Sequence, residues 1–289
     1  MSAFESLMKG LVDYAGLFPP ARLDMRGAVE AYVRHCGGRY SEMVGRFIVP
    51  TGRLGELADV VNEVAGGSDI GLWDISAIVG LECEGDLFTI SEFVKEQGGM
   101  FRVSAIELKA GSASFIDTAI DFVPEEMMAF FEIPLNMDYR GLITALSGTG
   151  HGAKIRTGGL TADLFPTVEE VGEFIWTCKQ AGVPFKATAG LHHPVRAFND
   201  NVDCTMHGFL NVFCAGAVCH LFDVERGDIE RILATESASD FQFTGGGLRV
   251  FDWELNGEDI ARVRREFALS YGSCSIDEPI EDLQGLGLV

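Results

Sequence analysis

Short apolar runs alternate with amphipathic stretches along most of the chain. Seven such runs predict strands, and each is followed by a stretch in which apolar residues recur every three or four positions, as they do on one face of a helix. Apolar strands separated by helices are typical of a parallel sheet that is covered on both faces. The predicted strands cover 12–18, 43–50, 69–80, 101–110, 127–136, 151–159 and 184–190, and the predicted helices cover 25–36, 54–65, 89–97, 113–122, 139–147, 167–182 and about 205–221.

Local capping signals support two of these helices. Thr89 and Thr167 are each followed three positions later by a glutamate, the spacing of a capping box at a helix start. Gly182 follows the second of these helices and is typical of a helix end.

The alternation changes after residue 222. A helix at 228–236 and a hairpin at 241–251 precede another helix at 257–267, an eighth strand at 268–275 and a short closing helix at 279–287. Eight strands with intervening helices in 289 residues predict an α/β fold of the TIM (β/α)₈ barrel type. We interpret 1–289 as one barrel domain with an insertion, a helix and a β-hairpin, at about 223–256. An open doubly wound sheet is the alternative, but no G-x-G-x-x-G follows the first strand.

Charge and cysteine content narrow the range of partners. The formal net charge is −21, from 43 acidic and 22 basic side chains, and such a field repels nucleic acid and anionic membranes. No apolar run reaches the ~20 residues of a membrane span, and no secretory leader is recognisable. The seven cysteines include no C-x-x-C pair, which favours free thiols in a reducing cytoplasm. We predict a cytoplasmic protein that acts on a small molecule without a cofactor, with a homo-oligomer left open.

Polar side chains lie at the ends of consecutive predicted strands. In a (β/α)₈ barrel the carboxyl ends of the strands and the loops that follow them form the active site. A cluster there is a candidate site, because scattered solvated charges would not gather at one rim. The residues at these ends are Arg46, Glu107, Lys109, Glu132, Lys154, Arg156, Lys186, His192, His193, Ser270, Ser273 and Ser275.

Two lysines within apolar strands indicate covalent chemistry. A lysine amine with a pKa of about 10.4 is protonated at neutral pH and does not attack a carbonyl group. Burial and a neighbouring cation both lower that pKa, and three units of lowering cost about 4 kcal/mol. We therefore predict Lys154 as the nucleophile of a Schiff base, Lys186 and Arg156 as the cations that lower its pKa, and Glu107 and Glu132 as the acid–base groups. A purely structural or anion-binding role for the same charges is the competing interpretation.

Five motifs, in order along the chain, resemble those of the deoxyribose-phosphate aldolase family. "AKIRTGG" and "PFKATAG" are similar to that family's two lysine motifs on strands six and seven. "AIELKAG" resembles its strand-four acidic segment, "FFEIP" its strand-five glutamate segment, and "YGSCS" its serine-rich turn after strand eight. The resemblance spans about residues 105–275 and implies a class I aldolase on a TIM barrel, with Lys154 as the Schiff-base lysine.

The chain departs from that family at several points. "AGLHHP" stands where the strand-seven motif has a second glycine, Arg156 lies within the lysine motif, and the insertion after residue 222 has no counterpart. We therefore predict a lyase that acts on a small carbonyl compound, with or without a phosphate. His192, His193, Arg46, Ser273 and Ser275 are the predicted substrate contacts.

Two further functions remain open at this point. Cys204-x-x-His207 has a spacing found among zinc ligands, so a metal-dependent lyase or hydrolase that uses His192, His193 and His207 is one alternative. The other is a non-catalytic binding barrel, whose rim would be filled by side chains and hold no pocket.

Overall fold

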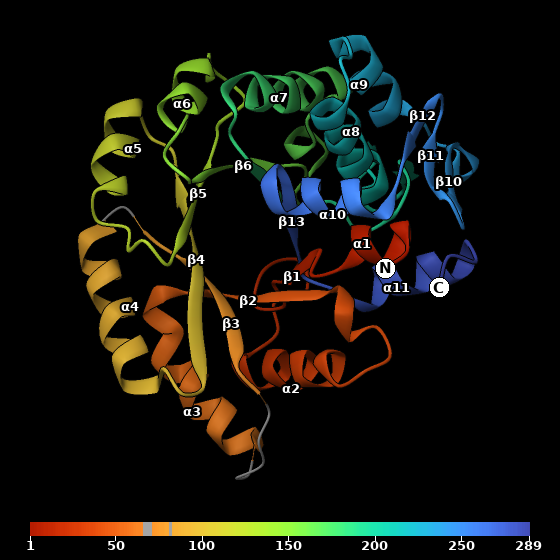
Figure 1. Ribbon diagram of the computed structural model, residues 1–289. Coiled ribbons are helices and arrows are strands. Elements are labelled where there is room, and N and C mark those ends of the chain that lie inside the picture. Colours follow the sequence, from red (N-terminus) through yellow and green to blue (C-terminus); the bar gives the residue numbers. More distant parts are fainter. Residues whose placement is uncertain (66–70, 81–82) are drawn as a thin grey trace.

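The barrel predicted from the sequence is confirmed. The computed structural model describes residues 1–65, 71–80 and 83–289, and its main sheet is a closed barrel of eight parallel strands (Figure 1). Around the barrel the strands follow the order β1-β13-β7-β6-β5-β4-β3-β2, so chain neighbours are also neighbours in space. The strands are β1 (Val12–Tyr14), β2 (Val44–Pro50), β3 (Trp73–Ile78), β4 (Phe101–Lys109), β5 (Met128–Glu132), β6 (Gly152–Arg156), β7 (Phe185–Thr188) and β13 (Ala268–Ser273).

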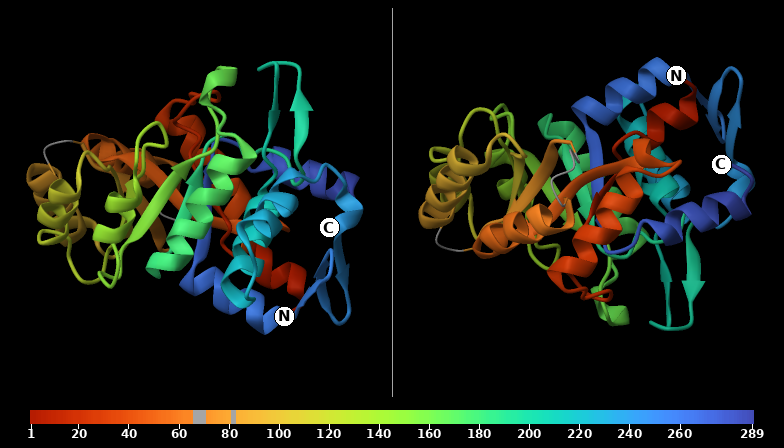
Figure 2. Two further views of the ribbon diagram at one scale, coloured as in Figure 1. Left: turned by 90° about the horizontal axis from the view of Figure 1, so that it is seen from above. Right: turned by 90° about the horizontal axis from the view of Figure 1, so that it is seen from below.

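Helices surround the barrel and cover its outer face (Figures 1 and 2). Each predicted helix is present, although several bounds differ by a few residues. The third strand also begins later than predicted, and residues 69–70 of its predicted range lie outside the described residues. The helices that follow the first seven strands are α2 (Met25–Cys36), α3 (Leu54–Ala65), α4 (Cys83–Gln97), α5 (Ala113–Ile120), α6 (Arg140–Ala145), α7 (Val168–Ala181) and α8 (Phe209–Leu221).

The capping predictions have opposite outcomes. Thr167 caps α7 as predicted, with its hydroxyl accepting from the backbone N–H of Glu170 and the Glu170 carboxylate accepting in return. Gly182 ends that helix in the left-handed conformation, at φ 64°. The prediction at Thr89 is wrong, because α4 is already helical from Cys83. The Thr89 hydroxyl instead donates to the Gly85 carbonyl inside the helix.

The segment after residue 222 contains the predicted helix and hairpin, with one further strand. Helix α9 (Arg226–Ala234) precedes an antiparallel sheet of β10 (Phe241–Thr244), β11 (Gly247–Val250) and β12 (Trp253–Leu255). Helix α10 (Gly257–Glu266) then leads into β13, and α11 (Asp277–Gly285) closes the chain.

A helix near the start of the chain and a second hairpin were also not predicted. Helix α1 (Ala3–Met8) packs against α10 and the β10–β11 hairpin. A second hairpin, β8 (Ala197–Asn199) with β9 (Cys204–Met206), projects from the body of the molecule (Figure 2). Cys204 therefore lies in a strand rather than at the start of a buried helix, and that helix, α8, begins only at Phe209.

The amino ends of β1 and β13 are joined through one arginine. The guanidinium of Arg264, on α10, donates to the backbone carbonyls of Leu7, Lys9 and Ala268. These contacts hold α1 and α10 at the amino end of the barrel. The opposite end, where the strands finish, is the one that a (β/α)₈ barrel uses for chemistry.

Within the described ranges, no helix has the length and apolar character needed to span a bilayer.

Candidate active site

A row of charged side chains crosses four adjacent strands inside the barrel. Lys109 pairs in register with Glu132, Glu132 with Lys154, and Lys154 with Lys186. Register partners in neighbouring strands face the same side of the sheet, so all four side chains face the barrel interior. Branched apolar side chains usually fill such an interior. Here a row of charges takes their place.

Lys186 is the most deeply buried of these residues, with no exposed side-chain surface. Its ammonium nitrogen lies 2.7 Å from Asp13 Oδ2, on β1, and 2.7 Å from Glu107 Oε1, on β4. It also lies 5.3 Å from the centre of the Phe130 ring. Two carboxylates and an aromatic face thus compensate the cost of burying this charge.

Glu107 joins the two lysines. Its Oε1 accepts from Lys186 and from the Ser76 hydroxyl, and its Oε2 lies 3.0 Å from the Lys154 nitrogen. Lys154, whose side chain is 7% exposed, also lies 2.7 Å from Glu132 Oε2. Both amines therefore lie next to one carboxylate and face the same interior.

The network continues outward from Lys154. Glu132 Oε1 accepts from Arg156 Nε at 3.2 Å, so one carboxylate contacts both cations of β6. At the deep end, Asp13 accepts from the Ser270 hydroxyl and from the Arg46 backbone N–H. The charged network, as we use the term below, comprises Asp13, Glu107, Glu132, Lys154, Arg156 and Lys186.

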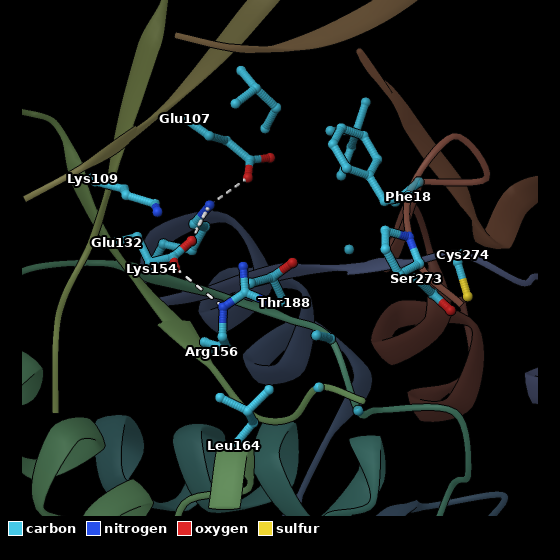
Figure 3. A pocket seen from close by; sticks show the side chains of 18 of the residues that line it. Phe18, Glu107, Lys109, Glu132, Lys154, Arg156, Leu164, Thr188, Ser273 and Cys274 are labelled. Atoms are coloured by element: carbon cyan, nitrogen blue, oxygen red, sulfur yellow. Dashed lines mark hydrogen bonds and ion pairs between the residues drawn. The ribbon is translucent and has the colours of Figure 1, made fainter. Parts of the chain in front are cut away.

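A cavity of about 610 Å³ opens directly above Lys154, at the carboxyl end of the strands (Figure 3). Lys154 lies at its floor, whereas Lys186 is beneath the floor and does not line it. The cationic side chains lie together on one side of the cavity, and Phe18, Ser273 and Cys274 lie on the other. The remaining walls come mainly from βα loops, with Ile48 from β2, and are mostly apolar; the loop residues include Pro19, Pro20, Val79, Leu160 and Leu164.

The electrostatics of Lys154 correct one expectation. Burial alone would lower the pKa of its amine, but the Glu107 and Glu132 carboxylates outweigh burial and raise that pKa above its usual value. The prediction that Lys186 and Arg156 lower the pKa is therefore wrong for the network as it stands. Carboxylates lie between the cations, and their attraction exceeds the repulsion.

The pKa values of the three carboxylates in the network are lowered. Burial would raise the pKa of Glu107, yet the charges of Lys186 and Lys154 hold it well below the usual value. The pKa of Asp13 is lowered against its burial by Lys186 and Arg46, and the pKa of Glu132 by Lys154 and Arg156. All three groups are therefore charged at neutral pH.

These shifts predict a loss of stability in acid. Carboxylates with lowered pKa values stabilise the fold above their unfolded pKa of about 4, and this contribution is lost as the pH falls through the folded values. The raised pKa of Lys154 stabilises below about 10.4 and is lost only above that pH. We therefore expect a plateau in the free energy of unfolding between these limits. Below pH 4 that free energy falls, measured by urea denaturation at successive pH values.

Glu107→Gln tests the origin of this acid dependence. The variant lacks one titrating carboxylate, so the slope of unfolding free energy against pH below pH 4 decreases by up to about 1.4 kcal/mol per pH unit. Asp117→Asn, which changes an exposed carboxylate on α5, is the matched control and keeps the wild-type slope. A Glu107→Gln protein with an unchanged slope would contradict the account.

The structure brings together all five residues predicted to be catalytic: Glu107, Glu132, Lys154, Arg156 and Lys186. Only some of the predicted substrate contacts line the cavity. His192 and Ser273 line the cavity, but His193 and Ser275 do not. Arg46 does not line it either.

Arg46 lies deeper than predicted because it is early in β2 rather than at its end. Its Nε donates to the Ser104 hydroxyl, and its Nη1 lies 3.6 Å from Asp13 Oδ2. Arg46 thus supports the buried part of the charged network, below the cavity floor.

The residues of the zinc alternative do not converge. His192 Nδ1 lies 2.7 Å from Glu278, and His193 Nδ1 lies 2.6 Å from Asp282, both on α11. His207 Nε2 instead contacts the Pro166 carbonyl. In the part of the chain that the structure describes, no three His, Cys, Asp or Glu side chains are grouped as metal ligands. The filled rim expected of a non-catalytic barrel is not observed, because a cavity occupies the carboxyl end.

Asp13 and Ser76 belong to the site but were missed by sequence reasoning. Asp13 lies within the apolar run of the first strand, which is the same signal that identified the two lysines. Ser76 gives no comparable signal, because a small hydroxyl residue is common in buried strands.

In comparisons with known proteins, no protein-family model and no curated protein matches the chain.

Proposed function

We propose that the protein is a lyase of the class I aldolase kind, which forms a Schiff base between Lys154 and a small carbonyl substrate. The resemblance to the deoxyribose-phosphate aldolase family implies the same chemistry. One observation carries the proposal: the Lys154 amine lies at the floor of a 610 Å³ cavity, in contact with two carboxylates that can take its proton.

The raised pKa of Lys154 is compatible with a nucleophilic role. Its proton has an acceptor at 2.7 Å in Glu132, so the amine can pass its proton to that carboxylate without exchange with solvent. Burial is the largest single influence on this pKa and it opposes the charged form. A substrate that displaces water from the cavity increases this effect and favours the neutral amine beside a protonated carboxyl.

The covalent steps then follow from the neighbouring groups. The neutral amine attacks the carbonyl carbon to give a carbinolamine. The hydroxyl group of the carbinolamine takes the proton held on the neighbouring carboxyl group and leaves as water, so that the protonated imine forms. For carbon–carbon cleavage, a carboxylate removes the proton of a hydroxyl group β to the imine carbon. The bond breaks, its electron pair passes to the imine to give an enamine, and an aldehyde departs. Protonation of the enamine gives the imine of the remaining fragment, and addition of water releases this fragment as a carbonyl compound and restores the free amine.

Lys186 acts as a positioning residue in this proposal. Its contact with Glu107 Oε1 fixes the carboxylate whose other oxygen faces Lys154. Because Lys186 lies beneath the floor, the substrate carbonyl reaches Lys154 first.

Borohydride trapping tests the proposal. The protein is incubated with a panel of aldehydes and ketones, reduced with sodium borohydride, digested and mapped by mass spectrometry. We expect one dominant adduct, on Lys154. Samples reduced without a carbonyl compound provide the blank, and exposed Lys95 serves as the internal comparison for surface reactivity. Adducts distributed according to exposure, or no adduct at all, would refute a Schiff-base site.

A further inference from the structure

We propose that the substrate is a 2-oxo acid, with its carboxylate bound by Arg156 and Lys109 and an apolar remainder against the opposite wall. This inference rests on the proposed function and specifies its substrate class.

Two cations at the cavity retain unused hydrogen-bond donors. Lys109 lines the cavity, and among the described residues it has no hydrogen-bond or ion-pair partner. Arg156 uses only Nε, in its contact with Glu132, so its terminal nitrogens have no partner within the described part of the chain. Both side chains lie on the same side of the cavity as Lys154 (Figure 3).

The charge around the cavity floor is positive although the protein as a whole is strongly negative. Lys109, Lys154, Arg156 and Lys186 are four cations, and Asp13, Glu107 and Glu132 are three anions. Arg46 adds a further positive charge below the floor. A singly charged carboxylate therefore enters a site with net positive charge, in a chain whose formal net charge is −21.

The position of Arg156 favours a carboxylate directly beside the carbonyl carbon. Lys154 Nζ and Arg156 Nε bind the two oxygens of the same Glu132 carboxylate, at 2.7 and 3.2 Å. The guanidinium is therefore close to the nitrogen that would form the imine. In a 2-oxo acid the carboxylate is bonded to the carbonyl carbon, so it lies next to that nitrogen, where Arg156 can bind it.

The opposite wall suits an apolar group rather than a phosphate. Phe18 lies on that side, and Pro19 and Pro20, which follow it in the same loop, are exposed at the cavity. Next to Arg156, in the loop after β6, Leu160 and Leu164 are 50% and 44% exposed. Apolar side chains left this open at a cavity rim become covered when an apolar group binds.

The Ser273 hydroxyl, which lines the cavity on the same side, is already engaged. The Ser273 hydroxyl donates to the Ser275 carbonyl, and the Ser275 hydroxyl accepts from the backbone N–H of Glu278. His192, the neighbouring base, contacts the Glu278 carboxylate. A doubly charged phosphate here would lie close to the negative charge of this carboxylate.

The test compares substrates that differ only in the proposed anchor. 4-Methyl-2-oxopentanoate and 4-methylpentan-2-one share a carbonyl group and an isobutyl group, but the second has a methyl group in place of the carboxylate. Glyceraldehyde 3-phosphate supplies a phosphorylated carbonyl compound. The measured quantity is the concentration that half-saturates borohydride trapping at Lys154, and Nα-acetyl-lysine in solution gives the intrinsic reactivity of each compound.

For the wild-type protein, the half-saturating concentration of the oxo acid is expected to be at least about ten-fold below that of the ketone, after correction for intrinsic reactivity. Arg156→Gln and Lys109→Met each lower the preference for the oxo acid, measured as the ratio of the ketone value to the oxo-acid value, by about ten-fold. Arg249→Gln and Lys95→Met, which alter exposed cations distant from the cavity, keep the wild-type ratio.

The outcomes separate the inference from the function on which it rests. Trapping of the ketone at Lys154 with no preference for the oxo acid overturns the substrate assignment and leaves the Schiff base standing. Tighter saturation by glyceraldehyde 3-phosphate than by the oxo acid also overturns the assignment. A protein that traps none of the three compounds at Lys154 refutes both proposals.

Discussion

Lys154→Arg is expected to abolish the borohydride-trapped adduct and to lower lyase activity by about three orders of magnitude or more. Arginine keeps the positive charge between Glu107 and Glu132, so the ion pairs of the wild-type residue are largely retained. Its guanidinium remains protonated at all accessible pH values and does not form an imine. The variant thus removes the nucleophile while it preserves the charge.

Folding and nucleophilicity are separated by a second variant and a control. Lys154→Met removes both the charge and the amine. Circular dichroism and urea denaturation show whether each variant is folded, so a loss of function in a folded variant is attributed to the missing amine. Lys95→Arg, at an exposed position on α4, keeps full trapping. A folded Lys154→Arg protein that still forms the dominant adduct would place the nucleophile elsewhere, and peptide mapping would identify it.

The order of elements could be predicted because each strand is an uninterrupted apolar run and each helix has a regular apolar face. The same reasoning located Lys154 and Lys186, since a lysine inside an apolar run must be buried with partners. Asp13 likewise lies inside an apolar run, in the first strand. The same reasoning would therefore have identified Asp13, at the deep end of the charged network.

The sequence-based predictions about the site were wrong where they depended on contacts between residues far apart in the chain. The sign of the Lys154 pKa shift depends on which charges are nearest, and Glu107 and Glu132 lie 47 and 22 residues away in the chain. Arg46 was misplaced although the end of its strand at Pro50 was predicted correctly, because it lies four residues before that end and its side chain therefore faces a different depth of the barrel. His192 and His193 were grouped as neighbours in sequence, but each is directed to its own carboxylate on α11.

Lys186→Met is expected to lower the free energy of unfolding by about 3–5 kcal/mol at pH 7. Lys186 is fully buried, and its removal deprives Asp13 and Glu107 of the ammonium that lies 2.7 Å from each. Methionine fills a similar volume, so the effect arises from carboxylates left without compensation rather than from a cavity. Lys95→Met, at an exposed position, changes the same free energy by about 0.5 kcal/mol or less.

A double variant and a pH series distinguish electrostatics from packing. Asp13→Asn removes one of the uncompensated charges, so we expect Lys186→Met/Asp13→Asn to be less destabilised than the sum of the two single variants. The destabilisation by Lys186→Met also decreases below pH 4. In the wild-type protein Lys186 lowers the pKa of Glu107 and Asp13, so without it these carboxylates become protonated at a higher pH and lose their uncompensated charge. A cost that is additive in the double variant and independent of pH would instead assign Lys186 a packing role, and the buried half of the charged network would then contribute little to holding Glu107 in place beside Lys154.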